Sequence, residues 1–293
     1  MNIKYTAIAL AVAGTVAAPM AAQAEVYASA RVGLVNTDTG GVSELRVRSL
    51  ASRFGLKSET DLGNGMTGFG KYEWDVDLEG ADSVKLRQRI VGLKGDFGSV
   101  TLGQAYHTFY NFVVGPTDNP WWGSGYAMVS YTGRTGDAIT YAGGAGDISF
   151  GVTGYLNGGG EEGLDGTEFG ASFGIGGMTL GVAVQDLEVN ADAATGVALT
   201  GIPAGDVSLG IGFQTRGDDS SVLVDAGFGN AYVHFESLDN DGGSAPTMLT
   251  VGYTQSLGRK TTAWYEFQSR DADTANSDDD MTVLRAMLKY DIM

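Results

Sequence analysis

The chain has 293 residues, no cysteine and a formal net charge of −17 at pH 7, with 46 glycines but only 5 prolines. This acidic balance excludes a nucleic-acid-binding protein, because phosphate contacts require clustered Lys and Arg, and the lack of cysteine excludes a disulfide scaffold. The 12 Phe, 13 Tyr and 4 Trp side chains are too many for a disordered chain.

Residues 1–24 predict a secretory signal peptide. They combine Lys4 near the start, an apolar stretch over residues 7–18 and a small-residue ending at Ala24. Cleavage after Ala24 leaves a mature domain over residues 25–293. An uncleaved anchor is the alternative, but no run in the chain approaches the ~20 apolar residues of a membrane helix. An exported chain without such a helix belongs in the periplasm, in the medium or, as a closed barrel, in the outer membrane.

From Lys71 onward, charged and apolar residues alternate strictly, which predicts a strand with two different faces. In a soluble sandwich the apolar face packs into a core; in an outer-membrane barrel it faces lipid, and the charged face lines a wet lumen. The export signal and the number of similar segments favour the barrel. We therefore expect Tyr72 and Trp74 on the lipid side. The residues expected in the lumen are Lys71, Glu73, Asp75 and Asp77.

Sixteen strands are expected in the mature chain, although the weak segment 195–202 leaves fourteen possible; an even number is usual for a single-chain bacterial barrel. In chain order they cover residues 26–35, 50–60, 65–79, 84–96, 98–105, 134–143, 147–155, 167–175, 178–188, 195–202, 206–215, 220–227, 230–238, 247–257, 260–270 and 281–292. Alternate connections are tight glycine turns, and the others are mostly longer and acidic. Short turns at one rim and long loops at the other are typical of outer-membrane barrels.

The connection over residues 106–133 differs from the rest because it is long, aromatic and nearly uncharged. A connection of this length is usually functional or disordered, and its aromatic content argues against disorder. It either packs over the outer rim or folds into the lumen and narrows it; we favour the second arrangement. Its notable side chains are Tyr106, Tyr110, Asp118, Trp121 and Trp122.

Three segments in order, over residues 52–57, 59–65 and 89–104, together with residues 250–262, resemble the general porins of Gram-negative outer membranes. They read Ser-Arg-Phe-Gly-Leu-Lys, Glu-Thr-Asp-Leu-Gly-Asn-Gly, Arg-Ile-Val-Gly-Leu-Lys-Gly-Asp-Phe-Gly-Ser-Val-Thr-Leu-Gly-Gln and Thr-Val-Gly-Tyr-Thr-Gln-Ser-Leu-Gly-Arg-Lys-Thr-Thr. The resemblance implies a sixteen-stranded antiparallel transmembrane β-barrel, usually a homotrimer, whose third outer loop bends inside to form a constriction.

By the same resemblance, basic residues on the barrel wall face carboxylates on the inner loop. The matching wall positions are Arg53, Lys85, Arg87 and Arg134, whereas Asp118 is the only acidic residue of the inner loop. The alternation itself puts Lys85, Arg87 and Arg89 on one face of a strand. A basic side chain facing lipid at mid-bilayer costs ~2 to 4 kcal/mol, so we assign this face to the lumen. The alternative is that these side chains lie near a rim and reach the lipid headgroups.

Catalytic and metal sites have little support in the sequence. The two histidines, His107 and His234, are far apart in the sequence and belong to no ligand-spaced cluster. The acidic stretch over residues 271–280 lacks the glycine of an EF-hand loop and reads better as a solvated loop than as a cation site. We expect no cofactor and no catalytic residues.

The leading hypothesis is a passive diffusion pore for small hydrophilic solutes and ions. A solute-specific channel is the alternative within transport, and a barrel enzyme or a plugged structural barrel is the alternative outside it. Because acidic residues line both the outer loops and the wall, the sequence favours mild cation selectivity at low salt that fades as salt rises.

Overall fold

The structure, a computed structural model, describes residues 23–76, 84–120, 124–130, 134–156, 163–274 and 279–292. The expected signal peptide up to residue 22, together with Asp77, Trp121 and Trp122, lies outside these ranges. None of the helices among the described residues is long and apolar enough to span a membrane.

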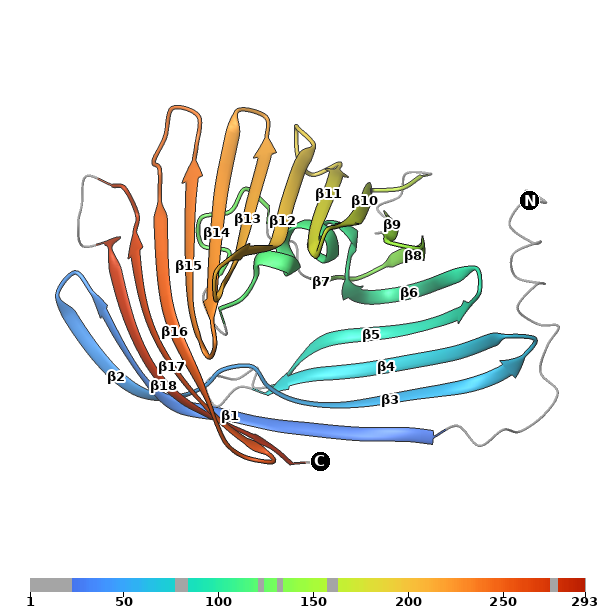
Figure 1. The fold of residues 1–293 in the computed structure, drawn as a ribbon, viewed down its shortest axis with the longest axis horizontal. Helices are drawn as coiled ribbons and strands as arrows, with labels where there is room; N and C mark the ends of the chain where they lie inside the picture. The colour runs from blue at the N-terminus through green and yellow to red at the C-terminus, as the bar shows by residue number, and fades with distance from the viewer. Residues whose placement is uncertain are drawn as a thin grey trace.

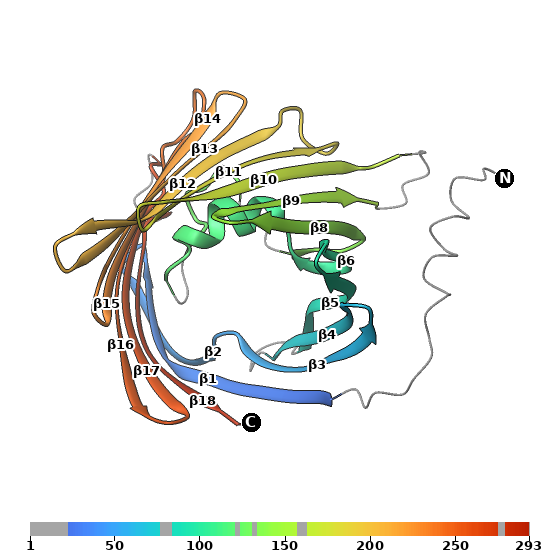
Figure 2. The same cartoon turned by 45° about the vertical axis from the view of Figure 1, so that its right-hand side comes forward.

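The described chain is one closed antiparallel sheet in which most segments pair with their neighbours in sequence and β1 pairs with β18 (Figures 1 and 2). Its segments are β1 (Gln23–Thr39), β2 (Val42–Ser49), β3 (Ser52–Gly63), β4 (Met66–Val76), β5 (Val84–Gly95), β6 (Gly98–Tyr106), β7 (Arg134–Thr135), β8 (Ala138–Ala145), β9 (Ile148–Tyr155), β10 (Gly166–Ile175), β11 (Met178–Leu187), β12 (Ala194–Ala204), β13 (Val207–Arg216), β14 (Asp219–Phe228), β15 (Ala231–Asp239), β16 (Thr247–Gly258), β17 (Thr261–Asp271) and β18 (Met281–Asp291).

These segments make a barrel of sixteen strands, because two of the strands are interrupted. β2 and β3 both pair with β1, and β7 and β8 both pair with β6. The sixteen-strand prediction is therefore confirmed within the described chain, and the weak segment at 195–202 is the full strand β12. Residues 36–49, which fall between the first two expected strands, also form strand: β1 and β2 continue past the expected ends and meet at a turn of Gly40 and Gly41.

The two rims differ as the glycine turns predict. At one rim, two-residue turns join neighbouring strands at residues 64–65, 96–97, 146–147, 176–177, 205–206, 229–230 and 259–260. At the other rim, the turns at 40–41 and 217–218 are equally short, but the remaining described connections are longer. The connection between β6 and β7, of which residues 107–120 and 124–130 are described, enters the barrel (Figure 2).

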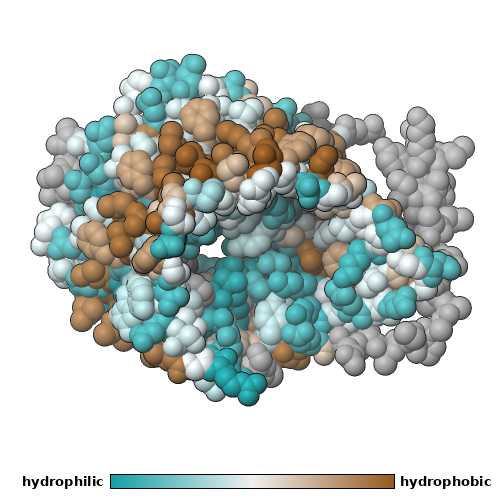
Figure 3. Space-filling view, viewed as in Figure 1, coloured by the Kyte–Doolittle hydropathy of each residue, from teal (hydrophilic) through white to brown (hydrophobic). Residues whose placement is uncertain are grey.

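The sheet is apolar outside and polar inside. Leu56, Tyr72 and Val91 on the outer face are 45, 50 and 59% exposed, whereas the inward Glu73 is 3% exposed. Trp74 also lies on the outer face, where its ring stacks on Phe54 at 4.9 Å between centroids. Figure 3 shows brown hydrophobic residues over the outside and hydrophilic residues beside a central opening. This is the sidedness that a lipid-embedded barrel requires.

A β-bulge in β5 changes which side chains reach the lumen. Glu73 pairs with Gln88 but Trp74 pairs with Leu86, so Arg87 is an extra residue. Directly opposed residues share a face. Arg89 opposes the outward Tyr72, and the prediction that Arg89 lines the lumen is therefore wrong. Beyond the bulge, the alternation in the sequence no longer predicts which face a side chain occupies.

Candidate functional site

The inner loop begins with a short π-helix, η1 (Tyr110–Val114), followed by the 3-10 turn η2 (Gly115–Thr117). Figure 2 shows this helical segment inside the barrel, against the wall formed by β9 to β13. Glycines on that wall allow the close approach. A Cβ at Gly181 would collide with the carbonyl oxygen of Phe112, and a Cβ at Gly196 would lie 2.7 Å from Cγ1 of Val113.

The first limb of the loop is held by a buried carboxylate on β10. Glu168 Oε2 accepts the N–H of Phe109 at 2.8 Å, while Oε1 accepts the hydroxyl of Tyr155 and the amide of Gln185, each at 2.7 Å. Glu168 is 1% exposed. A buried carboxylate with this many donors is satisfied and fixes the start of the loop in one place.

Burial also affects the histidine that precedes the helix. His107 is 1% exposed, and its Nε2 lies 2.5 Å from the backbone oxygen of Thr135 and 3.1 Å from the backbone nitrogen of the same residue. Burial lowers the pKa of His107, because the charged imidazolium loses its hydration.

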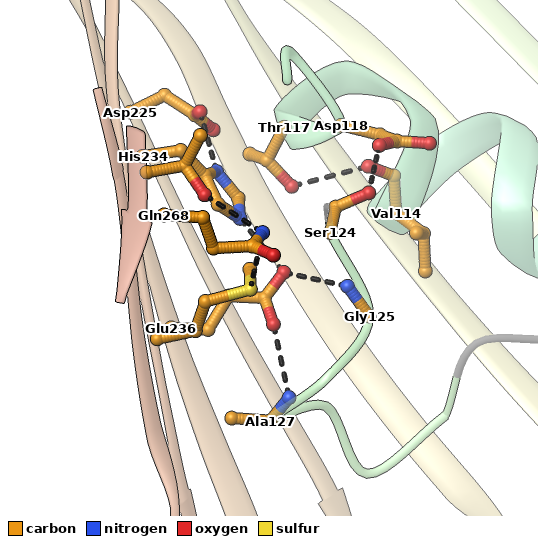
Figure 4. Close-up of polar contacts among 12 residues, drawn as sticks. Val114, Thr117, Asp118, Ser124, Gly125, Ala127, Asp225, His234, Glu236 and Gln268 are labelled. Carbon is orange, nitrogen blue, oxygen red and sulfur yellow. Dashed lines mark hydrogen bonds and ion pairs between the residues drawn. The ribbon is translucent and has the colours of Figure 1, made fainter. Parts of the chain in front are cut away.

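The returning limb is held by a second buried carboxylate, on β15 (Figure 4). Glu236 accepts the N–H of Gly125 at 2.7 Å and that of Ala127 at 2.9 Å. Behind it, His234 lies between Asp225 and Glu236, with both N···O distances 2.7 Å. The loop is therefore fastened at both ends to the β10–β15 side of the barrel.

A cavity of about 700 Å³ remains between the loop and the opposite wall. The strands of the wall contribute all five arginines and, at the end of β6, Tyr106, whereas the loop contributes Tyr110 and Asp118. Its lining residues are Arg31, Ala51, Arg53, Asp75, Arg87, Tyr106, Tyr110, Asp118, Asn119, Pro120, Ser124, Arg134 and Arg270.

Specific contacts order this lining. Arg87 Nε lies 3.0 Å from Glu73 and Nη1 lies 3.3 Å from Asp75. On the loop side, the Tyr110 hydroxyl donates to Asp118 at 2.7 Å, and Ser124 donates to the same carboxylate. The result is a narrow polar passage with a loop on one side and an arginine-bearing wall on the other.

Two rings and a guanidinium form a column along the passage. The rings of Tyr106 and Tyr110 stack at 4.2 Å, and the guanidinium of Arg134 lies 4.5 Å from the centre of the Tyr106 ring.

A family model described as Gram-negative porin matches residues 7–293. The chain belongs to this family. As a closed barrel of this family, it is an outer-membrane protein.

Similar proteins include Outer membrane protein F of Serratia marcescens, 36% identical over 99 residues, and Major outer membrane protein P.IB of Neisseria meningitidis, 33% identical over 133 residues. The matches cover 30 and 41% of this chain but only 26 and 38% of those proteins, so the alignments span well under half of each relative.

Solved structures share the fold along nearly the whole chain. Salmonella typhi OmpF, in complex with daunomycin, is 16% identical with a TM-score of 0.72, and covers 92% of this chain and 98% of its own. The anion-selective porin from Comamonas acidovorans is 16% identical with a TM-score of 0.71, at 92 and 100% coverage. The trimer form of OmpT from Vibrio cholerae is 12% identical with a TM-score of 0.66, at 92 and 99%.

The predicted wall residues of this porin come together in part. Arg53, Arg87 and Arg134 line the cavity. Lys85 opposes Asp75 across the β4–β5 ladder and so shares its inward face, but it is exposed and does not line the cavity. Arg89 lies outside, with Nη2 3.8 Å from Oδ1 of Asp137.

Only some of the predicted lumen and loop residues line the cavity. Tyr106, Tyr110, Asp118 and Asp75 line the cavity. Glu73 is buried, and Lys71 lies 3.3 Å from it, nearer to the short turn at residues 64–65. Asp77, Trp121 and Trp122 fall outside the described residues.

Sequence reasoning missed two lining arginines and the loop anchors. Arg31 lies on β1 and Arg270 lies on β17. The alternation of polar and apolar residues along each strand places both arginines on its polar face, so the sequence could have predicted them. The roles of Glu168 and Glu236 had no comparable signal, because their partners are backbone N–H groups far away in the sequence.

The described residues contain no group of three or more His, Asp or Glu side chains placed to hold a metal ion. In the acidic outer loop, Asp271 accepts the N–H of Asp273, and Asp273 accepts the N–H of Ala245 at 2.6 Å. These carboxylates are engaged in shaping the loop.

Proposed function

We propose that this porin forms a water-filled channel for passive diffusion of small hydrophilic solutes and ions across the outer membrane. The observation that carries the proposal is the passage itself. The inner loop is fastened to one side of the barrel, and a cavity of about 700 Å³, edged by polar side chains, is left on the other. The opening visible in Figure 3 agrees with such a path.

We further propose a homotrimer that forms after the signal peptide is cleaved at Ala24. The outward pair of Arg89 and Asp137 supports a protein contact on this wall, because charged side chains on the lipid face are costly near mid-bilayer. Phe54, Tyr72 and Trp74 form a stack on the same face. N-terminal sequencing of the purified protein tests the cleavage site, with Glu25 as the expected first residue.

A solute-specific channel is the second candidate. The column of Tyr110, Tyr106 and Arg134 favours it, because stacked rings beside a guanidinium offer a platform for planar solutes. A barrel enzyme has less support: Glu236 holds the loop, and His234 is engaged between Glu236 and Asp225.

Single-channel recording of the purified protein in planar bilayers tests the proposal. We expect stable openings in groups of three, each with a conductance proportional to the salt concentration. Heat-unfolded protein is the control and should give none. A silent bilayer would support a plugged barrel or an enzyme instead.

Liposome swelling with uncharged sugars of increasing size separates the two channel types. A general pore gives rates that fall smoothly with size, whereas a specific channel passes one solute much faster than others of equal size.

A further inference from the structure

We propose that the constriction is a binding subsite for small oxyanions, carboxylates and phosphates, and that it makes the channel anion-selective. This inference rests on the proposed channel function. It reverses the sign of the selectivity that the sequence favours, and it assigns a positive constriction to a chain whose net charge is −17.

The first step is the charge of the lining. Among the described residues around the cavity, five arginines face two aspartates. Asp75 is in contact with Arg87, and Asp118 accepts hydrogen bonds from Tyr110 and Ser124. The charges that an ion meets in this cavity are therefore mainly guanidinium groups. The arginines are Arg31, Arg53, Arg87, Arg134 and Arg270.

The second step concerns the carboxylates that the sequence assigns to the lumen. Glu73, which belongs to the acidic face of β4, is 3% exposed and lies between Arg87, Lys71 and the hydroxyl of Tyr27. It is therefore paired in the wall, where it offers little attraction to a passing cation.

The inward carboxylates of the opposite wall are buried as well. Glu168 and Glu236 are 1 and 0% exposed and accept N–H groups of the inner loop. Glu266, 4% exposed, lies 3.5 Å from Arg285 and accepts the hydroxyl of Tyr232. Folding thus uses most of the lumen's negative charge inside the wall.

The third step is distance. The outer loops carry much of the acid, but the Debye length is roughly 8 Å at physiological ionic strength. Charges at the rim farther than this from the constriction are screened there, whereas the arginines line the passage itself. The local positive charge therefore decides selectivity at the constriction, and the acidic loops act at the mouth.

The fourth step is the class of anion. A guanidinium presents a planar fork of donors that matches two oxygens of a carboxylate or phosphate, and chloride cannot use this geometry. Arg53 and Arg31 come from neighbouring strands, since Arg53 opposes Ser29 on β1, and Arg134 reaches in beside Tyr106. Several such forks along one wall of the passage favour an oxyanion over a halide.

The test combines reversal potentials with a phosphate probe in planar bilayers. Across a KCl gradient near physiological ionic strength, where the acidic loops are screened from the constriction, the wild-type reversal potential should show a preference for anions. Inorganic phosphate should reduce the chloride current in a saturable way. A double variant, Arg53→Ala with Arg134→Ala, leaves the buried Glu73–Arg87 pair intact. It should lower the anion-to-cation permeability ratio by up to about fourfold per arginine, because a unit charge ~10 Å away in water favours an anion and disfavours a cation by about twofold each.

Arg259→Ala, in a turn at the rim, is the matched control and should leave both readings unchanged. Arg53→Lys with Arg134→Lys keeps the charge, so it should keep the reversal potential while weakening the phosphate block. If phosphate blocks the Lys variant as strongly as it blocks the wild-type channel, the proposed recognition of oxyanions by the guanidinium fork is wrong. Open channels with a cation-side potential, or an Ala variant that matches wild type, overturn the selectivity proposal alone; a silent bilayer overturns the channel function.

Discussion

Glu236 and His234, two residues apart on β15, both point into the barrel and lie in contact, with Oε1 of the glutamate 2.7 Å from Nε2 of the histidine. The same glutamate accepts two backbone N–H groups of the inner loop. Wall and loop are thus joined through one buried carboxylate.

Replacing this carboxylate should loosen the returning limb of the loop. In Glu236→Gln the side chain keeps its size but loses its charge, and one loop N–H faces an amide donor. Hydrogen bonds to charged groups contribute ~1.5 to 3 kcal/mol, so we expect a loss of about this size. Thermal unfolding followed by circular dichroism, and protease cleavage between residues 124 and 130, measure it.

Glu59→Gln is the control for that variant. Glu59 forms an exposed ion pair with Lys94 at 2.7 Å, a kind of contact that contributes ~0 to 1 kcal/mol. Equal losses in the two variants would show that Glu236 does not anchor the loop.

Gly181→Ala should displace the inner loop. Its Cβ would meet the carbonyl oxygen of Phe112, a backbone atom that cannot rotate away. Overpacking of this kind costs ~1 to 3 kcal/mol, and we expect a lower melting temperature together with a changed single-channel conductance.

Gly227→Ala provides the comparison. Gly227 lies on β14, and the nearest atom to its Cβ would be 3.9 Å away. Conductance that is unchanged in Gly181→Ala, or equally changed in Gly227→Ala, would contradict the packing of the loop on Gly181.

Arg89→Ala should leave ion selectivity unchanged, because the bulge in β5 turns this side chain to the outer face. Its removal breaks the contact with Asp137, and we expect a less stable trimer in gel electrophoresis of unheated samples, by up to ~1 kcal/mol. A shifted reversal potential would place Arg89 in the lumen after all.

His107 should make the folded barrel less stable in acid. Burial lowers its pKa below the unfolded value of ~6.5, so the unfolded chain binds more protons as the pH falls. The contribution of His107 is complete above about pH 6.5 and is lost below it. Melting temperatures between about pH 7.5 and 5 should fall less in His107→Gln than in wild type; parallel curves would rule out this histidine as the source.

Period two and the glycine turns located all sixteen barrel strands, because each strand separates an apolar outside from a polar inside. The largest error is in the second strand, which was expected to begin at residue 50 but begins with β2 at Val42. The same rule failed where the ladder is irregular. Arg89 follows the alternation in sequence, yet the extra residue at Arg87 reverses its side, and only the pairing with β4 reveals this. The outer part of β1 and β2 was missed since Val42 and Leu45 are both exposed, at 74 and 64%, on a hairpin whose sides differ little.

The constriction was predictable only as far as residue types go. Resemblance pointed to Arg53, Arg87 and Arg134, and all three line the cavity. Whether a lumen carboxylate is available to ions or consumed by folding depends on partners distant in sequence. Glu73 and Glu236 look alike in the sequence, but one is paired within the wall and the other holds the loop.

The strands that hold the inner loop are different from most of the strands that carry the arginines of the passage. Strands β9 to β15 carry the glycines and carboxylates that seat the loop, whereas most of the arginines that border the passage come from β1, β3, β5 and β7. Changes in the second group can alter what passes without disturbing the seat of the loop. Transport preference and structural integrity are thus separately adjustable, which makes this barrel a suitable starting point for engineered pores.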